Sequence, residues 1–271
     1  MIRLSKWHSD ILIIIEERER MKVITAFFMA WGNFIVLPCP YKKWDGKLKN
    51  LMLAFLPAVG AVIGLLWMAL YWVLMQLDIP LLLIGFVMMF YPFAVCGFMH
   101  MDGFMDCNDA ILSRRPLEER QRILKDSTVG AFAVVTVAFL LLCWFAAVSS
   151  AVYRIGFADL LLLPVISRGI GGFSVLTYKP IGHSQYVEDY KMPGRGKYRA
   201  AVFVQIAVLA AIAGFISGDP VRTLVCAAIN AAAAFLACAY GRKQLGGMSG
   251  DIAGYTICTG ELAGIIALAV L

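Results

Sequence analysis

The chain has 271 residues, of which 61% are hydrophobic and only 15% are charged, whereas roughly a quarter of an ordinary soluble domain is charged. A soluble protein would have to bury so much apolar sequence at once, which excludes a soluble enzyme, a disulfide scaffold and a disordered chain. The apolar residues come in seven blocks, each near the ~20 residues that cross a bilayer as a helix: 51–77, 80–98, 131–151, 159–178, 200–217, 221–240 and 252–271. This predicts an all-α, polytopic transmembrane helical bundle with about seven spans.

The first forty residues fit this pattern less well. A short apolar run at 11–15 is followed by charged residues, which predicts an N-terminal extension at 1–22 ahead of a single integral-membrane domain at 23–271. Residues 23–37 are apolar, but they contain Asn33 and stop at Pro38. A tilted span, a re-entrant segment and an interfacial helix are all open for 23–37, and we favour a helix that does not fully cross.

Basic residues alternate between the loops along the chain. Three of the loops between the blocks, those near Asp78, Arg154 and Arg222, hold only two basic residues in total. The other four loops hold sixteen: Lys42, Lys43, Lys47, Lys49, Arg114, Arg115, Arg120, Arg122, Lys125, Lys179, Lys191, Arg195, Lys197, Arg199, Arg242 and Lys243. Cytoplasmic loops carry an excess of Lys and Arg, so these four loops are predicted to face the cytoplasm together. The net charge of +6 therefore indicates membrane topology, with the lipid bilayer as partner and no nucleic acid.

One acidic cluster follows the second apolar block. Asp102, Asp106 and Asp109 have the spacing i, i+4, i+7, which places three carboxylates on one helical face. Carboxylates this close repel one another unless a cation neutralises them, and oxygen ligands favour Mg²⁺ or Mn²⁺ over zinc. The alternative is a solvated acidic face, but Gly103 and Phe104 between the acids disfavour it. His100, two residues before Asp102, has a structural hydrogen bond and a catalytic role as equal alternatives.

Further chemistry is predicted at the same membrane boundary. Lys125 and Asp126 precede the third block, at the depth of the acids. A glycine-rich loop containing Gly247 and Gly250 leads to Asp251 at the start of the last span, and such a loop allows backbone N–H groups to approach a phosphate. Packing of glycine between helices is the alternative there. Two basic residues are candidates for binding an anionic substrate: the intramembrane Arg168 and Lys179 from the third basic loop.

Several of these segments resemble the cobalamin-5′-phosphate synthase (adenosylcobinamide-GDP ribazoletransferase) family. Residues 97–109 are similar to its G-L-H-x-D-G-x-x-D-x-x-D pattern, 125–130 to its K-D-S-x-x-G, and 247–254 to its G-x-T-G-D-x-x-G. Residues 37–40 and 55–60 are similar to its L-P-x-P and F-P-x-V-G segments. The ordered set runs from about residue 23 to the end. Ala110 and Ser249 depart from the usual Gly and Thr, and 1–20 have no counterpart.

The resemblance implies the final assembly step of cobamide synthesis. Adenosylcobinamide phosphate would pass from adenosylcobinamide-GDP to α-ribazole or α-ribazole 5′-phosphate, with release of GMP, at a bacterial or archaeal cytoplasmic membrane. Asp102, Asp106 and Asp109 would hold Mg²⁺ against the diphosphate. Asp109 or Asp126 would take a proton from the attacking hydroxyl, and Lys125 would stabilise phosphate charge. The oligomeric state is open, a homo-oligomer included.

Two rival functions remain to be tested. A CDP-alcohol phosphotransferase also sets spaced aspartates at a cytoplasmic helix end, but its D-G-x-x-A-R-x8-G-x3-D-x3-D pattern requires an Arg that does not follow Asp102 and Gly103 here. A cation transporter with Asp102 and Asp106 in its path would place its acids near mid-membrane and often shows inverted repeats. The acids here cluster at one boundary, and we find no repeat in the sequence.

Overall fold

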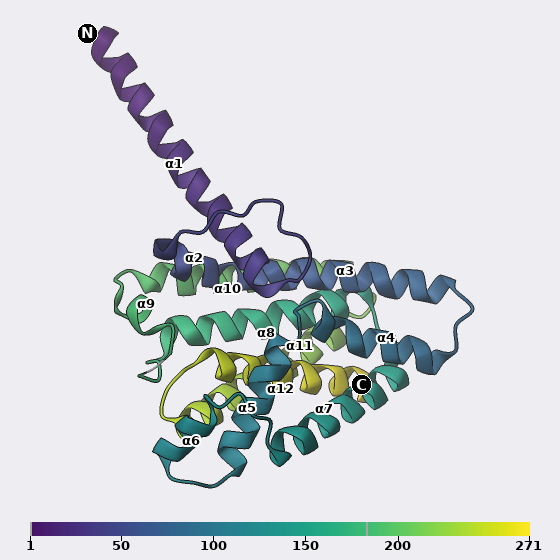
Figure 1. Ribbon diagram of the computed structural model, residues 1–271. Helices are drawn as coiled ribbons and strands as arrows, with labels where there is room; N and C mark the ends of the chain where they lie inside the picture. The colour runs from purple at the N-terminus through teal and green to yellow at the C-terminus, as the bar shows by residue number, and fades with distance from the viewer. Residues whose placement is uncertain (1, 183) are drawn as a thin grey trace.

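The computed structural model describes residues 2–182 and 184–271, with side chains from residue 16 onward. The described residues form α-helices joined by short loops (Figure 1), and the one extended contact among them is an isolated bridge between Pro180 and Met248. The elements are α1 (Ile2–Phe34), η1 (Gly46–Leu48), α2 (Lys49–Ala54), α3 (Leu56–Gln76), α4 (Leu81–Ala94), α5 (Met99–Leu112), α6 (Leu117–Ile123), α7 (Ala131–Ala151), α8 (Phe157–Thr177), α9 (Val187–Lys191), α10 (Arg195–Ile216), α11 (Pro220–Leu245) and α12 (Gly250–Val270).

The predicted polytopic bundle is confirmed. Within the described residues, six helices are long and apolar enough to cross a membrane: α3, α7, α8, α10, α11 and α12. The pair α4 and α5 passes the same test when taken together, which gives seven. Helix α1, by contrast, is not among these candidates. It is continuous from Ile2 to Phe34, so the predicted boundary after residue 22 falls inside one helix. The division into an extension and a domain stays a prediction.

The second apolar block is not one straight span. Residues 80–98 contain the 14-residue helix α4, after which the chain bends by 83° into α5. At about 1.5 Å per residue, α4 alone covers only ~21 Å, less than the hydrocarbon core. The bend lies at Gly97 and Phe98, both with φ of +60°. This left-handed backbone ends the first helix and re-aims the second, so the acids lie on a separate helix, α5.

The first block is also interrupted. Residues 51–77 divide at Phe55 into the short α2 and the long α3. Pro57 stands in the first turn of α3, where the lack of an N–H group is tolerated, but it cannot continue the preceding helix. The break frees α2 to pack beside α1, α8 and α10 at the basic end of the bundle.

Helix α8 is the central element. It packs against α3, α10, α11 and α12, and 89% of its most apolar stretch is buried. Glycines in α3 allow this helix to approach it closely. A Cβ added at Gly60 would lie 2.4 Å from the carbonyl oxygen of Pro164, and one at Gly64 would lie 2.8 Å from that of Leu160. Small residues at such crossings allow two membrane helices to pack backbone against backbone.

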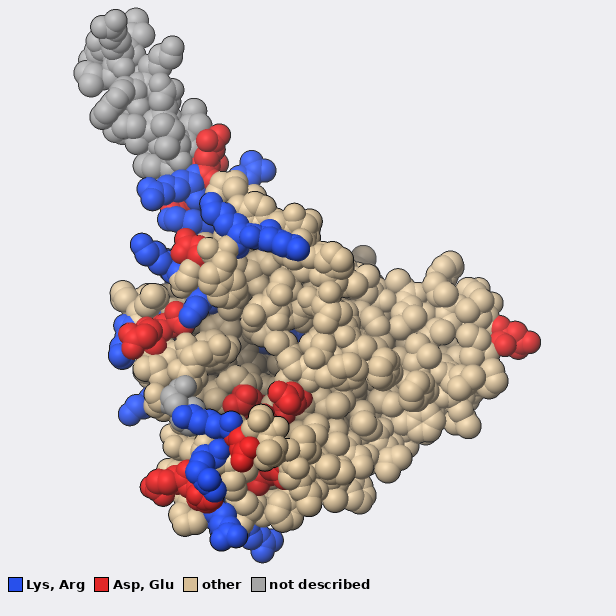
Figure 2. Space-filling model, viewed as in Figure 1, with Lys and Arg blue, Asp and Glu red and all other residues tan. Residues whose placement is uncertain are grey.

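Charged side chains gather at one end of the molecule. In the view of Figure 2, Lys and Arg lie along the left side, and acids lie beside a hollow there. The right part of the molecule is almost free of charged side chains in this view. The charged end carries the loops of α2, α6 and α9 (Figure 1). The four loops predicted to face one side together therefore lie at one end of the bundle, and the C-terminal end of α12 lies at the opposite end, beside Arg154 and Arg222.

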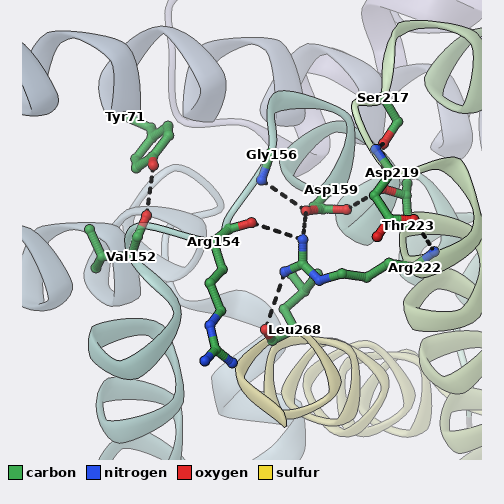
Figure 3. Close-up of polar contacts among 10 residues, drawn as sticks. All are labelled: Tyr71, Val152, Arg154, Gly156, Asp159, Ser217, Asp219, Arg222, Thr223 and Leu268. Atoms are coloured by element: carbon green, nitrogen blue, oxygen red, sulfur yellow. Dashed lines mark hydrogen bonds and ion pairs between the residues drawn. The ribbon is translucent and has the colours of Figure 1, made fainter. Parts of the chain in front are cut away.

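A polar cluster ties the opposite end together (Figure 3). Asp159, in the first turn of α8, accepts hydrogen bonds from the Gly156 N–H (2.9 Å) and the Thr223 hydroxyl (2.7 Å), and it lies 3.6 Å from the Arg222 guanidinium. Arg222 donates in turn to the carbonyl oxygens of Arg154 and Leu268. One buried carboxylate and one arginine thus connect α8, α11, α12 and the end of α7.

Candidate active site

A cavity of about 480 Å³ opens at the basic end of the bundle. Its walls come from α1, α2, α3, α5, α8, α12 and the loops beside them. The lining residues are Asn33, Phe34, Trp44, Lys49, Met52, Leu53, Leu56, Met99, His100, Asp102, Arg168, Gly171, Val175, Gln185, Tyr186, Gly250, Asp251, Ala253, Gly254 and Ile257. Of the site residues predicted from the sequence, five line it: His100, Asp102, Arg168, Gly250 and Asp251.

Close contact of α5 with the N-terminal end of α12 builds the acidic wall. A Cβ added at Gly103 would lie 2.8 Å from the Asp251 Cα, and one at Gly254 would lie 2.8 Å from the His100 carbonyl oxygen. Ser249 caps α12 by accepting a hydrogen bond from the Ile252 N–H at 3.3 Å. These glycines therefore act as close-approach positions, and they bring together two motifs that are about 150 residues apart in the sequence.

Asp102 and Asp251 face the cavity from the two helices, and Asp106 follows Asp102 by one turn on α5. Asp106 is partly buried, and its carboxyl group lies in the field of the Asp102, Asp251 and Asp109 carboxyl groups. In the described part of the chain, no group of three or more His, Cys, Asp or Glu side chains is arranged as a ready metal cage. The donor chemistry nevertheless fits Mg²⁺, which commonly takes one or two carboxylates and completes its shell with water and substrate phosphate.

Asp109 has a structural partner that its sequence position did not reveal. It is buried, and its two carboxylate oxygens accept the N–H groups of Gly130 (2.6 Å) and Ala133 (3.0 Å). It therefore caps the start of α7 from the neighbouring helix, at the helix end that favours negative charge. A Cβ at Gly130 would lie 2.5 Å from Asp109 Oδ1, so a larger residue would not fit at this position. The metal and base roles predicted for Asp109 stay predictions.

Three other predicted residues lie outside the cavity lining. Lys125 and Asp126 are exposed in the loop between α6 and α7. The N–H and hydroxyl of Thr128 donate to Asp126 Oδ1 at 2.9 and 2.8 Å and hold the pKa of that carboxyl below its ordinary value, which makes Asp126 a weaker base. Lys179 is exposed, and its carbonyl oxygen accepts the Met248 N–H.

Gly247 also lies outside the cavity lining. A Cβ there would lie 2.8 Å from the Ile181 nitrogen. The residue therefore serves the contact between its loop and the loop after α8, which supports the packing alternative for this glycine.

Arg168 and His100 form the inner wall of the cavity. Arg168 is 1% exposed and pairs through Nη1 with the buried Glu261 of α12, while its Nη2 donates to Cys96 Sγ at 3.4 Å. Its Nε and the Nε2 of the buried His100 have no hydrogen-bond partner among the described residues. Buried polar atoms normally find partners, so these two nitrogens are candidates for contact with a polar ligand.

Sequence reasoning missed several residues of this site. Glu261 was hidden in an apolar block, although an acid inside a span is itself a signal of function. Lys49 was counted only as a topology residue, yet it lines the cavity and pairs with Asp189 at 3.5 Å. Tyr186, from the loop before α9, also lines the cavity. Burial raises the pKa of its phenol, which keeps it protonated.

The chain was compared with known proteins. The model of the cobalamin-5-phosphate synthase family matches residues 26–269. Curated relatives named adenosylcobinamide-GDP ribazoletransferase are similar over most of their length. That of Clostridium perfringens (strain SM101 / Type A) is 34% identical over 91% of this chain and 98% of its own. That of Clostridium botulinum (strain Alaska E43 / Type E3) is 35% identical over 89% and 95%, respectively.

A more distant relative of the same name, from Geobacillus kaustophilus (strain HTA426), is 30% identical over 87% of this chain and 92% of its own. No solved structure matches. The acids on α5, the segment before α7 and the glycine-rich start of α12 are the motifs that suggested the family from the sequence, and the first and last of them meet at the cavity. The chain belongs to the cobalamin-5-phosphate synthase family.

Proposed function

We propose that this protein is an adenosylcobinamide-GDP ribazoletransferase. It transfers adenosylcobinamide phosphate from adenosylcobinamide-GDP to α-ribazole or α-ribazole 5′-phosphate and releases GMP. The observation that carries the proposal is the cavity in which Asp102 and Asp251 meet across the contact of α5 and α12. The curated relatives, which this chain matches over nearly their whole length, are named for this activity. The activity is the final step of cobamide assembly.

Asp102, Asp106 and Asp251 are the residues that would hold Mg²⁺. An ion held by them would supply positive charge to the diphosphate of the donor and to the departing phosphate of GMP. Without a bound cation, these carboxylates would repel an anionic substrate. Asp109 contributes by fixing the start of α7 beside α5.

In the reaction, a ribose hydroxyl oxygen of the acceptor forms a new bond to the phosphorus attached to adenosylcobinamide. The bond from that phosphorus to the oxygen of GMP breaks, and the hydroxyl proton passes to a base, the role predicted for Asp109 or Asp126. His100 lines the cavity, and its Nε2 has no partner among the described residues, so we assign it to accept a hydrogen bond from this hydroxyl. Arg168 Nε and Lys49 supply positive charge toward the phosphates.

We further propose that the site faces the cytoplasm from a bacterial or archaeal cytoplasmic membrane. The cavity opens at the end that carries the four basic loops, and an excess of Lys and Arg marks cytoplasmic loops. This orientation also gives the site access to nucleotide substrates. No nucleic acid is required, because the basic residues belong to the membrane boundary.

Donor competition tests the proposal. Purified protein in detergent is given Mg²⁺ and one of two substrate pairs. The first pair is adenosylcobinamide-GDP with α-ribazole 5′-phosphate, and the second is CDP-diacylglycerol with an alcohol. We expect GMP and the cobamide product from the first pair and no CMP from the second. Turnover with CDP-diacylglycerol and none with adenosylcobinamide-GDP would replace this function with a phospholipid-synthesising one. Metal uptake by proteoliposomes without any group transfer would establish a cation transporter instead.

A further inference from the structure

A second hollow of about 590 Å³ adjoins the cavity. It lies between the C-terminal end of α1 and the loop that follows α1, and it shares Asn33 and Trp44 with the first cavity. The proposed sites for the metal ion and the donor diphosphate lie in the first cavity and leave this hollow without a ligand. A reaction that joins two organic substrates needs room for both, and the first cavity already has to admit the diphosphate of the donor.

The wall of this hollow is pre-formed. The single S–H group of Cys39 lies within donating distance of the carbonyl oxygens of Phe28 (3.5 Å) and Tyr41 (3.2 Å). Trp31 Nε1 donates to the Leu37 carbonyl oxygen at 3.2 Å. The loop is anchored to the bend between α4 and α5 as well, by the Val36 N–H at 2.9 Å from the Val95 carbonyl oxygen. A loop held by three such donors loses little conformational entropy when a ligand binds.

The lining of the hollow combines cations with aromatic rings. Lys42 and Lys43 are exposed and make no ion pair with a described residue, and no carboxylate lines the hollow. Phe28, Tyr41 and Trp44 add aromatic surface, and Trp44 is 57% exposed at the rim shared with the cavity. Unpaired ammonium groups attract a phosphate, and exposed aromatic faces stack on flat heterocycles. The combination suits a nucleotide monophosphate.

The acids separate the two compartments chemically. A phosphate bound beside Asp102 and Asp251 needs a metal ion between them, whereas a phosphate beside Lys42 and Lys43 needs none. The donor diphosphate therefore belongs with the acids. A second anion that enters the same site meets cations and no carboxylate on the side of Lys42 and Lys43.

We propose that this hollow binds the acceptor as its 5′-phosphate. The phosphate lies against Lys42 and Lys43, the base lies against Trp44 and Tyr41, and the ribose reaches past Asn33 toward the carboxylates. The inference rests on the proposed function, because it assigns one of its two substrates to a site.

The test compares two acceptors in a lysine double variant. In Lys42→Gln/Lys43→Gln, the KM for α-ribazole 5′-phosphate should rise by about tenfold or more, which corresponds to ~1.4 kcal/mol or more. The KM for unphosphorylated α-ribazole, the KM for adenosylcobinamide-GDP and kcat should change less than about twofold. Lys47→Gln is the matched control, because Lys47 is an exposed lysine just beyond the hollow that does not line it.

Equal rises for both acceptors, a rise confined to the donor, or no rise would each overturn the assignment. All assays use a neutral detergent. If the double variant differs from the wild type only after anionic lipid is added, the lysines bind lipid headgroups and the proposal is wrong. Equilibrium dialysis of α-ribazole 5′-phosphate without donor separates this inference from the function: weaker binding to the double variant supports the hollow even in a protein that shows no turnover, and unchanged binding contradicts it.

Discussion

At the scale of single residues, carboxylates of the same helix have different tasks. Asp102 is exposed to the cavity, whereas Asp109, two turns later, is buried with both oxygens occupied by backbone N–H groups. Their spacing predicted a shared face, which the helix α5 confirms. The spacing could not reveal that the start of α7 would occupy one of them, because that contact depends on the path of the chain between residues 113 and 130.

We therefore expect Asp109→Asn to act mainly on stability. An Asn side chain can accept only one of the two N–H groups, and leaving one buried donor unsatisfied costs about 1–3 kcal/mol. Gly130→Ala should have a similar effect, since its Cβ would intrude on the same carboxylate. Both variants should melt at lower temperature in detergent while they retain far more turnover than Asp102→Asn. An inactive Asp109→Asn with unchanged melting, beside a normal Gly130→Ala, would show instead that Asp109 serves the metal or the proton transfer.

At the scale of helices, α8 and α12 are joined by a buried ion pair. Arg168 and Glu261 are 1% and 2% exposed, so each charge depends on the other. Arg168 was visible in the sequence as an intramembrane cation, but its partner could not be inferred because the packing of α8 against α12 sets it. The bend at Gly97 and Phe98 was likewise hidden, since Phe98 is not a residue type that favours a left-handed backbone. The break at Phe55 did have a signal, namely Pro57.

Removing one partner of this pair should destabilise the folded protein strongly, whereas replacing both partners should not. Glu261→Leu leaves a buried guanidinium unpaired and should destabilise the protein by about 3–5 kcal/mol. Arg168→Met/Glu261→Leu should recover most of the lost melting temperature, because an apolar pair of similar volume replaces the charges. If Arg168 also binds substrate, the recovered double variant keeps a raised KM for adenosylcobinamide-GDP. Wild-type kinetics in the double variant would restrict Arg168 to a structural role.

At the scale of the whole molecule, the charges divide the bundle into two ends. The basic loops, the cavity and the adjoining hollow share one end, and the Asp159–Arg222 cluster closes the other. The seven-block pattern and the alternating loop charges were enough to predict the bundle and this polarity. They could not predict the hollow beside α1, because the irregular loop at 35–45 leaves no periodic signal.

Cysteine labelling tests the orientation. In a background without Cys39 and Cys143, which are partly or fully exposed, single cysteines replace Lys47, Glu118, Glu188 and Lys243. All four positions are exposed in loops or helix ends on the basic side. An impermeant reagent should reach them only in inverted vesicles. A cysteine at Tyr153, which is 77% exposed at the other end, should react in intact cells. One of the four reacting from outside would break the shared cytoplasmic face.

The central claim is that the carboxylates on α5 are where the transfer takes place, and Mg²⁺-dependent GMP release from adenosylcobinamide-GDP in matched carboxylate variants tests it most directly. Asp102→Asn and Asp106→Asn keep side-chain size but remove a metal ligand, so release should fall by about 10²-fold or more, in part rescued by added Mg²⁺. Glu118→Gln removes an exposed charge from α6 and should release GMP at the wild-type rate. Full Mg²⁺-dependent release by Asp102→Asn and Asp106→Asn, with normal folding, would contradict the account.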